Sequence, residues 1–390
     1  MSVTFARVFK AAGEVAGLKS SGKADVSLVV NDGPKKVGAG VFTSNRVKAA
    51  PVKWSLQAVN DGVVEAVLLN SGGANACTGP AGFADTHHSA EYIAKLLDVS
   101  PGDVLVCSTG LIGLPLDMPK LLAGIDSGVA QLDNSNAAGI AAAQAIMTTD
   151  TVAKTATFEH ASGWRIGGMA KGAGMLAPGL ATMLCVITTD VDLPAGDLQT
   201  VLRQVGEQTF NRIDSDGCMS TNDSVILLAS GSSGLSPEIA DFAAGLHEVC
   251  WSLGQQLIAD AEGASHEIEI TVVGARDEFG ALEVARSVSR SNLFKAAIFG
   301  NDPNWGRILS ALGTVSPLVA PFDADDVDVS INGVKVCQSS GIGVDRNQVD
   351  LAATRKVTVL IDLKYGEKTV TLLTNDLTHD YVHENSAYSS

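Results

Sequence analysis

The residues around Ala181-Thr182 could carry out nucleophilic chemistry, because two unlike segments meet there. Residues 171–180 hold too many glycines and prolines for a helix or a central strand, whereas residues 182–189 are apolar and β-branched like a buried strand. At such a junction a self-cleaving protein could expose an N-terminal threonine. The freed α-amino group, with a pKa of about 8, could accept the hydroxyl proton and activate Thr182 as a nucleophile. The alternative interpretation is a glycine-rich turn that enters a core strand.

A second candidate is the turn of Thr109 and Gly110, which follows an expected strand at residues 104–107. A hydroxyl and a backbone N–H lie side by side there, and these are the components of an oxyanion hole, although many turns share them. Residues 70–79 are small, amide-bearing and glycine-rich, which fits a backbone-lined binding loop or a plain connection equally well. Residues 148–151 add a cluster of hydroxyls.

No metal site is expected from the sequence. The polar loop at residues 211–223 contains Asp214, Asp216 and Asn222, which resemble calcium ligands. The glycine and the terminal glutamate of an EF-hand are missing at the required offsets, so we interpret this loop as structural or as facing the substrate. The cysteines lie too far apart in the sequence for a zinc-type CxxC pair.

The composition narrows the class of protein. With 390 residues, 46% hydrophobic and 18% charged, the chain is long enough for two or three domains with a large core. A net charge of −16 argues against binding to nucleic acids or to anionic membrane surfaces, since both need clustered lysine and arginine. We expect no signal peptide and no membrane span, and therefore a cytoplasmic protein whose cysteines are reduced.

The predicted elements combine many strands with fewer helices. Strands are expected at residues 25–30, 39–42, 65–69, 104–107, 182–189, 268–273, 326–331, 334–337, 357–363 and 368–374, with hairpins joining the last two pairs. Helices are expected at residues 85–97, 136–147, 197–210, 237–262 and 278–287. Because strands outnumber the helical crossovers of a doubly wound sheet, we predict an α+β fold with sheets packed on each other and helices outside.

Several of these segments together resemble the ArgJ family, glutamate N-acetyltransferase, also called ornithine acetyltransferase. The resemblance rests on blocks at residues 70–79, 108–113, 147–151, 171–185, 216–223, 260–263, 298–307 and 376–390. One block alone would be a weak signal. Because the blocks follow one another in the family's order along nearly the whole chain, the set is highly specific. The chain does not depart from the family's pattern at any position that matters for the chemistry.

The resemblance implies that the precursor cleaves itself between Ala181 and Thr182. The products would be an α chain of residues 1–181 and a β chain of residues 182–390, assembled as an α2β2 heterotetramer. The implied fold is an αββα sandwich similar to N-terminal-nucleophile and DmpA-like folds. A smaller C-terminal α/β domain would occupy roughly residues 275–390.

The resemblance also implies the roles of individual residues. Thr182 would be the nucleophile, and Thr109 and Gly110 would form the oxyanion hole. The residues in contact with the amino-acid substrate would be Thr148, Lys171, Thr182, Glu262, Asn385 and Ser390. No cofactor is implied.

The implied reaction moves an acetyl group from N-acetylornithine to glutamate through an acetyl-threonine, in a ping-pong cycle. Some members of the family also accept acetyl-CoA as the donor, and no residue of this chain decides that question. A rival interpretation is an N-terminal-nucleophile amidase or aminopeptidase, in which water takes the acyl group. A third is a non-catalytic protein that binds amino acids.

Overall fold

The computed structural model describes residues 1–177 and 183–387, and these fold into two compact units. Unit 1 contains residues 1–211 and 218–257. Unit 2 contains residues 212–217 and, within the described part of the chain, residues 258–387. Each unit builds its own sheets and its own core.

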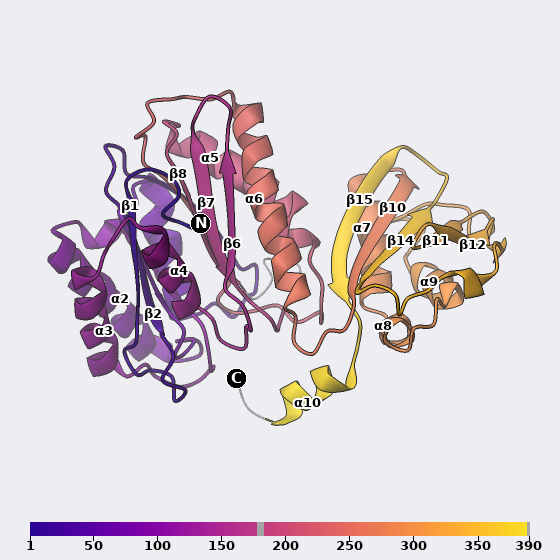
Figure 1. Ribbon diagram of the computed structural model, residues 1–390, viewed down its shortest axis with the longest axis horizontal. Helices are drawn as coiled ribbons and strands as arrows, with labels where there is room; N and C mark the ends of the chain where they lie inside the picture. The colour runs from indigo at the N-terminus through magenta and orange to yellow at the C-terminus, as the bar shows by residue number, and fades with distance from the viewer. Residues whose placement is uncertain (178–182, 388–390) are drawn as a thin grey trace. The chain divides into compact units, whose positions relative to one another are not determined.

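Unit 1 contains two mixed sheets (Figure 1). The first has four strands in the order β1-β2-β4-β5, with bounds Phe9–Glu14, Val26–Asn31, Ala66–Asn70 and Val104–Ser108. The second has five strands in the order β3-β9-β8-β7-β6, with bounds Val37–Phe42, Ser224–Ala229, Leu184–Thr189, Arg165–Lys171 and Lys154–Glu159. Within each sheet one pair is parallel, β4 with β5 and β8 with β9, and the other pairs are antiparallel.

The two sheets of unit 1 pack face to face. Alternate residues of their strands point into one shared apolar cluster, whose members include Val67, Leu69, Leu105, Val186, Ile226 and Leu228. Since successive side chains of a strand point to opposite faces, the remaining residues must be covered on the outside. Strands β4, β5, β8 and β9 are buried along their whole length, so both outer faces are covered.

Helices supply that cover. Helices α2 (Gly79–Leu97) and α3 (Met118–Ala130) pack on the outer face of the first sheet, beside α1 (Ala50–Ala58). Helix α6 (Ile239–Ala259) packs on the second sheet, where Gly168 leaves room for Val249 and Leu253. Helix α5 (Ala195–Gln208) lies against β3, and α4 (Asn136–Ala145) lies against β1. The predicted α+β class with an αββα sandwich is confirmed.

Unit 2 is a two-layer structure. Its sheet has six strands in the order β13-β12-β11-β14-β10-β15, with bounds Gly341–Ile342, Val334–Gln338, Asp328–Ile331, Lys356–Asp362, Glu267–Ala275 and Lys368–Asn375. Helices α7 (Glu278–Ser289), α8 (Asn292–Phe299) and α9 (Trp305–Leu312) share an apolar cluster with one face. Helix α10 (His379–Ala387) follows β15. Short 3₁₀ helices occupy Val59–Asp61, Pro101–Asp103, Phe210–Arg212 and Arg346–Gln348.

One of the two predicted hairpins is confirmed and the other is wrong. Strands β11 and β12 pair around Asn332 and Gly333, whose φ angles of 46° and 81° are those of a tight hairpin turn. Strands β14 and β15 do not pair, because β10 lies between them, parallel to β14 and antiparallel to β15. Between these two strands, the apolar side chains of Ile268, Ile270 and Val272 on β10 are buried in the core of unit 2.

Several predicted helix boundaries are wrong. Helix α2 begins at Gly79 and not at Asp85, because Pro80 is accommodated in the first turn, where its missing N–H has no helical partner. Helix α6 ends at Ala259, before Glu262. Lys171, which we predicted to be irregular, is the last residue of β7, and the strand predicted from residue 182 begins at Leu184. Among the described residues, no helix is long and apolar enough to cross a membrane.

Candidate active site

The turn of Thr109 and Gly110 is held between the ends of two parallel strands. Thr109 donates its backbone N–H to Asn70 O at 2.9 Å and accepts a hydrogen bond from Gly73 N at 3.1 Å. Gly110 has φ +124°, and a Cβ there would lie 2.9 Å from Gly73 N, so only glycine fits. Among the described residues no acceptor takes the Gly110 N–H. The turn therefore presents a fixed backbone donor beside a hydroxyl.

A buried charge cluster lies next to this turn. Lys171 Nζ donates to Thr109 Oγ1 at 3.3 Å and lies 3.9 Å from Asp150 Oδ2. The other oxygen of Asp150 receives Lys154 Nζ and the Gly172 N–H, each at 2.6 Å. Lys154 is 0% exposed, Lys171 2% and Asp150 5%. Burial by itself raises the pKa of Asp150, but Lys171, Lys154 and the Gly172 N–H outweigh it and hold that pKa well below its usual range.

Thr148 belongs to the same cluster. It donates its backbone N–H to Asp150 Oδ2 at 2.9 Å, and its hydroxyl lies 3.5 Å from the same oxygen. Asp150 contacts both Thr148 and Lys171, and Lys171 contacts Thr109, so the structure brings together three predicted residues that are far apart in the sequence. Asp150 lay inside the predicted hydroxyl cluster, but nothing in the sequence pattern indicated that it would connect these residues.

Lys19 is a further cation at this edge of unit 1 that the sequence did not indicate. Its ammonium donates to Met147 O at 2.6 Å and to Ala24 O at 2.7 Å. Burial lowers its pKa to about 8, opposed by Asp25 and reinforced by Lys171. The region beside Thr109 is therefore positively charged overall, which favours a carboxylate or a developing oxyanion.

Unit 2 brings together two other predicted residues. Asn385 on α10 donates its amide N–H to Glu262 Oε2 at 3.0 Å and to Tyr381 O at 3.0 Å. Gly263, with φ +62°, leaves space for the backbone of α10, since a Cβ there would lie 2.3 Å from Tyr381 N. Thr378 Oγ1 closes this contact by donating to Gly263 O at 2.6 Å. Glu262 and Asn385 thus form one polar pair with fixed geometry.

Ala181, Thr182 and Ser390 lie outside the described residues. The neighbour of Thr182 does not. Met183 donates its backbone N–H to Asp223 Oδ1 at 3.1 Å, and Leu184 pairs with Lys171 in the ladder between β8 and β7. The chain just after Thr182 is therefore next to the residue whose ammonium contacts Thr109.

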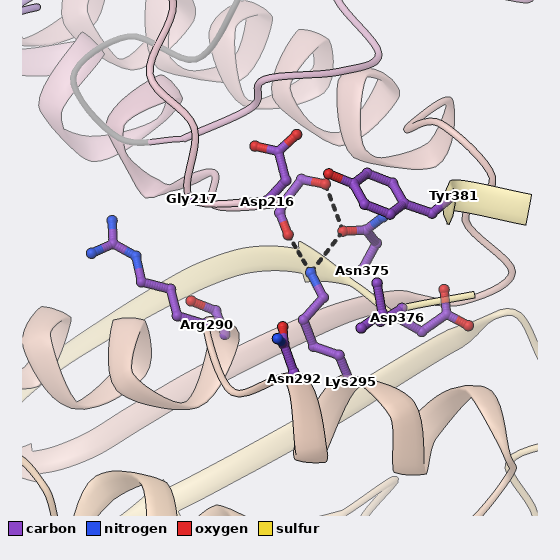
Figure 2. Close-up of a pocket in the computed structure, with 11 residues that line it drawn as sticks. Asp216, Gly217, Arg290, Asn292, Lys295, Asn375, Asp376 and Tyr381 are labelled. Carbon is purple, nitrogen blue, oxygen red and sulfur yellow. Dashed lines mark hydrogen bonds between the residues drawn. The ribbon is translucent and has the colours of Figure 1, made fainter. Parts of the chain in front are cut away.

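Unit 2 also contains a polar cavity of about 260 Å³ (Figure 2). Lys295 Nζ points into a group of oxygens and donates to Ser215 O and to Asn375 Oδ1, whereas the guanidinium of Arg290 points away (Figure 2). Arg290 instead pairs with Asp214 at 2.6 Å. These contacts tie residues 212–217 to the end of β15.

The loop at residues 211–223 is structural in its described contacts. Asp214 pairs with Arg290, while Asn222 donates to Ala74 O at 2.7 Å and to Ser108 O at 2.8 Å. The side chains of Asp214 and Asn222, which resembled calcium ligands, are therefore committed to protein partners, whereas Asp216 lines the cavity of unit 2. Across residues 1–177 and 183–387 no three His, Cys, Asp or Glu side chains gather closely enough to hold a metal ion.

Comparison with known proteins decides the family. The model of the ArgJ family matches residues 10–390. The chain belongs to the ArgJ family. The arginine biosynthesis bifunctional protein ArgJ of Streptomyces avermitilis is 58% identical over 390 residues, covering 100% of both chains. The protein of the same name from Mycolicibacterium paratuberculosis is 50% identical over 394 residues, covering 100% of this chain and 96% of the relative.

A solved ArgJ-family structure is also similar. The ornithine acetyltransferase of Mycobacterium tuberculosis, crystallised with ornithine, is 53% identical, covers 47% of this chain and 96% of its own, and has a TM-score of 0.45. Family membership confirms the predicted family, and with it the prediction of an acyltransferase of arginine biosynthesis. The roles of individual residues remain predictions.

Proposed function

We propose that this ArgJ-family protein transfers an acetyl group from N-acetylornithine to glutamate, with Thr182 as the acyl carrier. The observation that carries the proposal is the contact of Lys171 with Thr109, made where Lys171 pairs with Leu184, two residues after Thr182. A backbone donor, a hydroxyl and a buried ammonium converge beside the start of β8, which follows Thr182 in the sequence. Such fixed donors suit a tetrahedral oxyanion.

The proposed cycle has two half-reactions. Thr182 Oγ attacks the acetyl carbonyl of N-acetylornithine while the α-amino group of Thr182 takes the hydroxyl proton. The amide C–N bond then breaks, and the departing amine of ornithine receives that proton. The amine of glutamate attacks the resulting ester, its proton returns to Thr182 Oγ, and N-acetylglutamate leaves. Thr109 and Gly110 stabilise the oxyanion in both halves.

The proposed substrate-binding residues are Thr148, Lys171, Thr182, Glu262, Asn385 and Ser390. In unit 1, Lys171 and Thr148 sit in a region with an excess of positive charge, which suits a carboxylate. In unit 2, the carboxylate of Glu262 and the amide of Asn385 suit an ammonium group. Ser390 and the α-amino group of Thr182 complete the proposed set. The relative from Mycobacterium tuberculosis was crystallised with ornithine, which supports this choice of ligand.

The proposed maturation is self-cleavage between Ala181 and Thr182. The hydroxyl of Thr182 attacks the Ala181 carbonyl, the peptide nitrogen leaves as the α-amino group, and water hydrolyses the ester. We propose an α chain of residues 1–181, a β chain of residues 182–390 with a smaller C-terminal domain from roughly residue 275, and an α2β2 heterotetramer. The proposed location is the cytoplasm, which would keep the free thiols reduced.

Acetyl-CoA is a second proposed acetyl donor. Relatives across the family carry the name bifunctional protein, which favours a second activity. Synthesis of N-acetylglutamate from acetyl-CoA and glutamate by the purified protein would establish it. Transfer only from N-acetylornithine would make this protein monofunctional.

The role of Thr109 is tested by Thr109→Ala. We expect kcat to fall about 100-fold while KM for N-acetylornithine changes little, since the lost hydroxyl acts on the transition state. Thr200→Ala is the matched control, because the Thr200 hydroxyl is exposed and only caps Gly196 O within α5. Normal turnover by Thr109→Ala would contradict the assignment. Release of acetate at a rate that glutamate does not affect would instead favour the amidase.

The self-cleavage is tested by mass spectrometry of the purified chains. The wild type should yield two fragments, the second beginning at Thr182, whereas Thr182→Ala should remain one chain. Thr182→Ser should still cleave, more slowly, because the hydroxyl remains without the methyl group that orients it. An intact wild-type chain would contradict the maturation and favour a non-catalytic amino-acid-binding protein.

A further inference from the structure

Asp223 is a buried carboxyl next to the start of β8. It directly precedes β9, is 0% exposed, and accepts the Met183 N–H on Oδ1 at 3.1 Å. Its second oxygen, Oδ2, is buried and has no hydrogen-bond partner among the described residues. Burial raises the pKa of Asp223 well above its usual range, although hydrogen bonds and the charge of Lys171 oppose this. Lys171 on β7 is the charged group that faces it.

Asn222, the preceding residue, reaches in another direction. Its amide donates to Ala74 O and to Ser108 O, and its own oxygen accepts the Thr221 hydroxyl at 2.6 Å. Ser108 is the last residue of β5 and is followed directly by Thr109. Two consecutive side chains before β9 therefore hold the start of β8 and the end of β5.

We propose that Asn222 and Asp223 are positioning residues that set the separation between Met183, which follows Thr182 in the sequence, and the oxyanion turn at Thr109. This inference rests on the proposed function. If Asp223 no longer accepts the Met183 N–H, or Asn222 no longer donates to Ser108 O, the backbone on that side of the site can shift. A shift of about 1 Å between reacting groups can cost about 100-fold in rate. Asn222 and Asp223 supply that restraint from the second sheet, which contains β8 itself.

The restraint requires an acceptor oxygen on Asp223 and not a charge, because the contact with the start of β8 is a single hydrogen bond from the Met183 N–H to Oδ1. A neutral carboxyl keeps its carbonyl oxygen for Met183 and needs no counter-ion. An asparagine has the same shape, the same carbonyl acceptor and no charge, so it should replace Asp223 in this role.

The test compares Asp223→Asn with Asp223→Ala. We expect Asp223→Asn to cleave itself and to keep kcat within about threefold of the wild type. Asp223→Ala should cleave slowly, and its mature fraction should lose at least about tenfold in kcat with little change in KM.

The matched control is Asp190→Asn, at the other end of β8. Asp190 is also buried, and it accepts the Arg165 N–H and pairs with Arg7, each at 2.8 Å. Asp190→Asn should lower the free energy of unfolding but leave kcat unchanged.

Asn222 is tested by a double-mutant cycle with Thr109. Asn222→Ala should lower kcat about tenfold, and Asn222→Ala with Thr109→Ala should be no slower than Thr109→Ala alone, because both act through the same turn. Additive losses would overturn the role of Asn222. Wild-type rates in folded Asp223→Ala, or equal damage from Asp223→Asn and Asp223→Ala, would overturn the role of Asp223 as the acceptor of the Met183 N–H. If the wild type itself transfers no acetyl group, the proposed function fails first, which separates the two outcomes.

Discussion

Both units bury a lysine ammonium, but they compensate its charge differently. In unit 1, Lys154 lies 2.6 Å from Asp150, which also faces Lys171 and the Gly172 N–H. In unit 2, Lys295 donates to neutral oxygens of Ser215, Thr374 and Asn375. An ion pair offsets much of the cost of desolvation, whereas neutral oxygens offset less of it.

The pKa values reflect that difference. Asp150 keeps a pKa well below its usual range although it is buried, so its charge persists at neutral pH. Burial lowers the pKa of Lys295 from 10.5 to about 8, and the more distant Asp214, Asp216 and Asp376 only partly oppose this. Near the proposed chemistry the protein maintains a fixed charge cluster. In unit 2 the buried cation loses its proton at a lower pH than an exposed lysine does.

The largest effect is expected from Asp150→Ala. Removing this carboxylate leaves the ammonium groups of Lys154 and Lys171 buried without it, which should destabilise unit 1 by about 3–5 kcal/mol in urea unfolding. The matched control is Asp32→Ala, which breaks an exposed pair with Lys10 and should cost less than about 1 kcal/mol. Equal losses in the two variants would show that the cluster of unit 1 is not what stabilises it.

A smaller effect on stability is expected when the pH is raised through the range in which Lys295 loses its proton. The unfolded lysine keeps its proton up to about pH 10.5 and the folded one releases it near pH 8, so the unfolded state binds more protons between these values. Relative to Lys295→Met, the wild type should therefore gain up to about 3 kcal/mol as the pH rises through this window. Hydrogen exchange of the β15 amides in both proteins measures this difference in the free energy of unfolding. A constant difference across that range would contradict the lowered pKa.

The smallest effect is a difference between two lysine substitutions. Lys154→Met removes one of the two cations that face the buried Asp150, whereas Lys295→Met removes a donor to neutral oxygens. We expect Lys154→Met to cost about 1–2 kcal/mol more than Lys295→Met, because a buried charge that loses part of its compensation costs more than a neutral oxygen that loses a donor. Urea unfolding of both variants measures the two costs, and equal costs or a reversed order would contradict the expected difference between the two modes of burial.

Local sequence predicted the elements whose signals are short-range. The Asn332-Gly333 turn specified its hairpin, because few residue pairs accept positive φ at both positions. Strands β5 and β8 were recognisable as apolar, β-branched runs between turn residues. Strands β6 and β7 were not predicted, since KTATFE has few apolar residues and RIGGMAK contains two glycines. They form strands because β8 offers them a hydrogen-bonding partner.

The sequence predicted those residues of the candidate site that lie in motifs of the family. Thr109, Gly110, Lys171 and Thr182 stand in segments that resemble one family, and that resemblance named them without any geometry. Asp150, Lys154, Asn222 and Asp223 were not identified as parts of the site. Their importance depends on burial and on partners up to about 148 residues away in the chain, such as Ala74 for Asn222. No local pattern reports such a contact.

By itself, the sequence determined the family, the α+β class and the residue types available for acyl transfer. Each follows from motifs or from the alternation of apolar residues, which act over a few positions. Only the tertiary structure decided that β10 separates β14 from β15 and that Asp150 joins Thr148 to Lys171. It also decided that Asp223 meets Met183. Sheet order and the pairing of buried charges depend on which distant segments exclude water together, and that is a property of the whole fold.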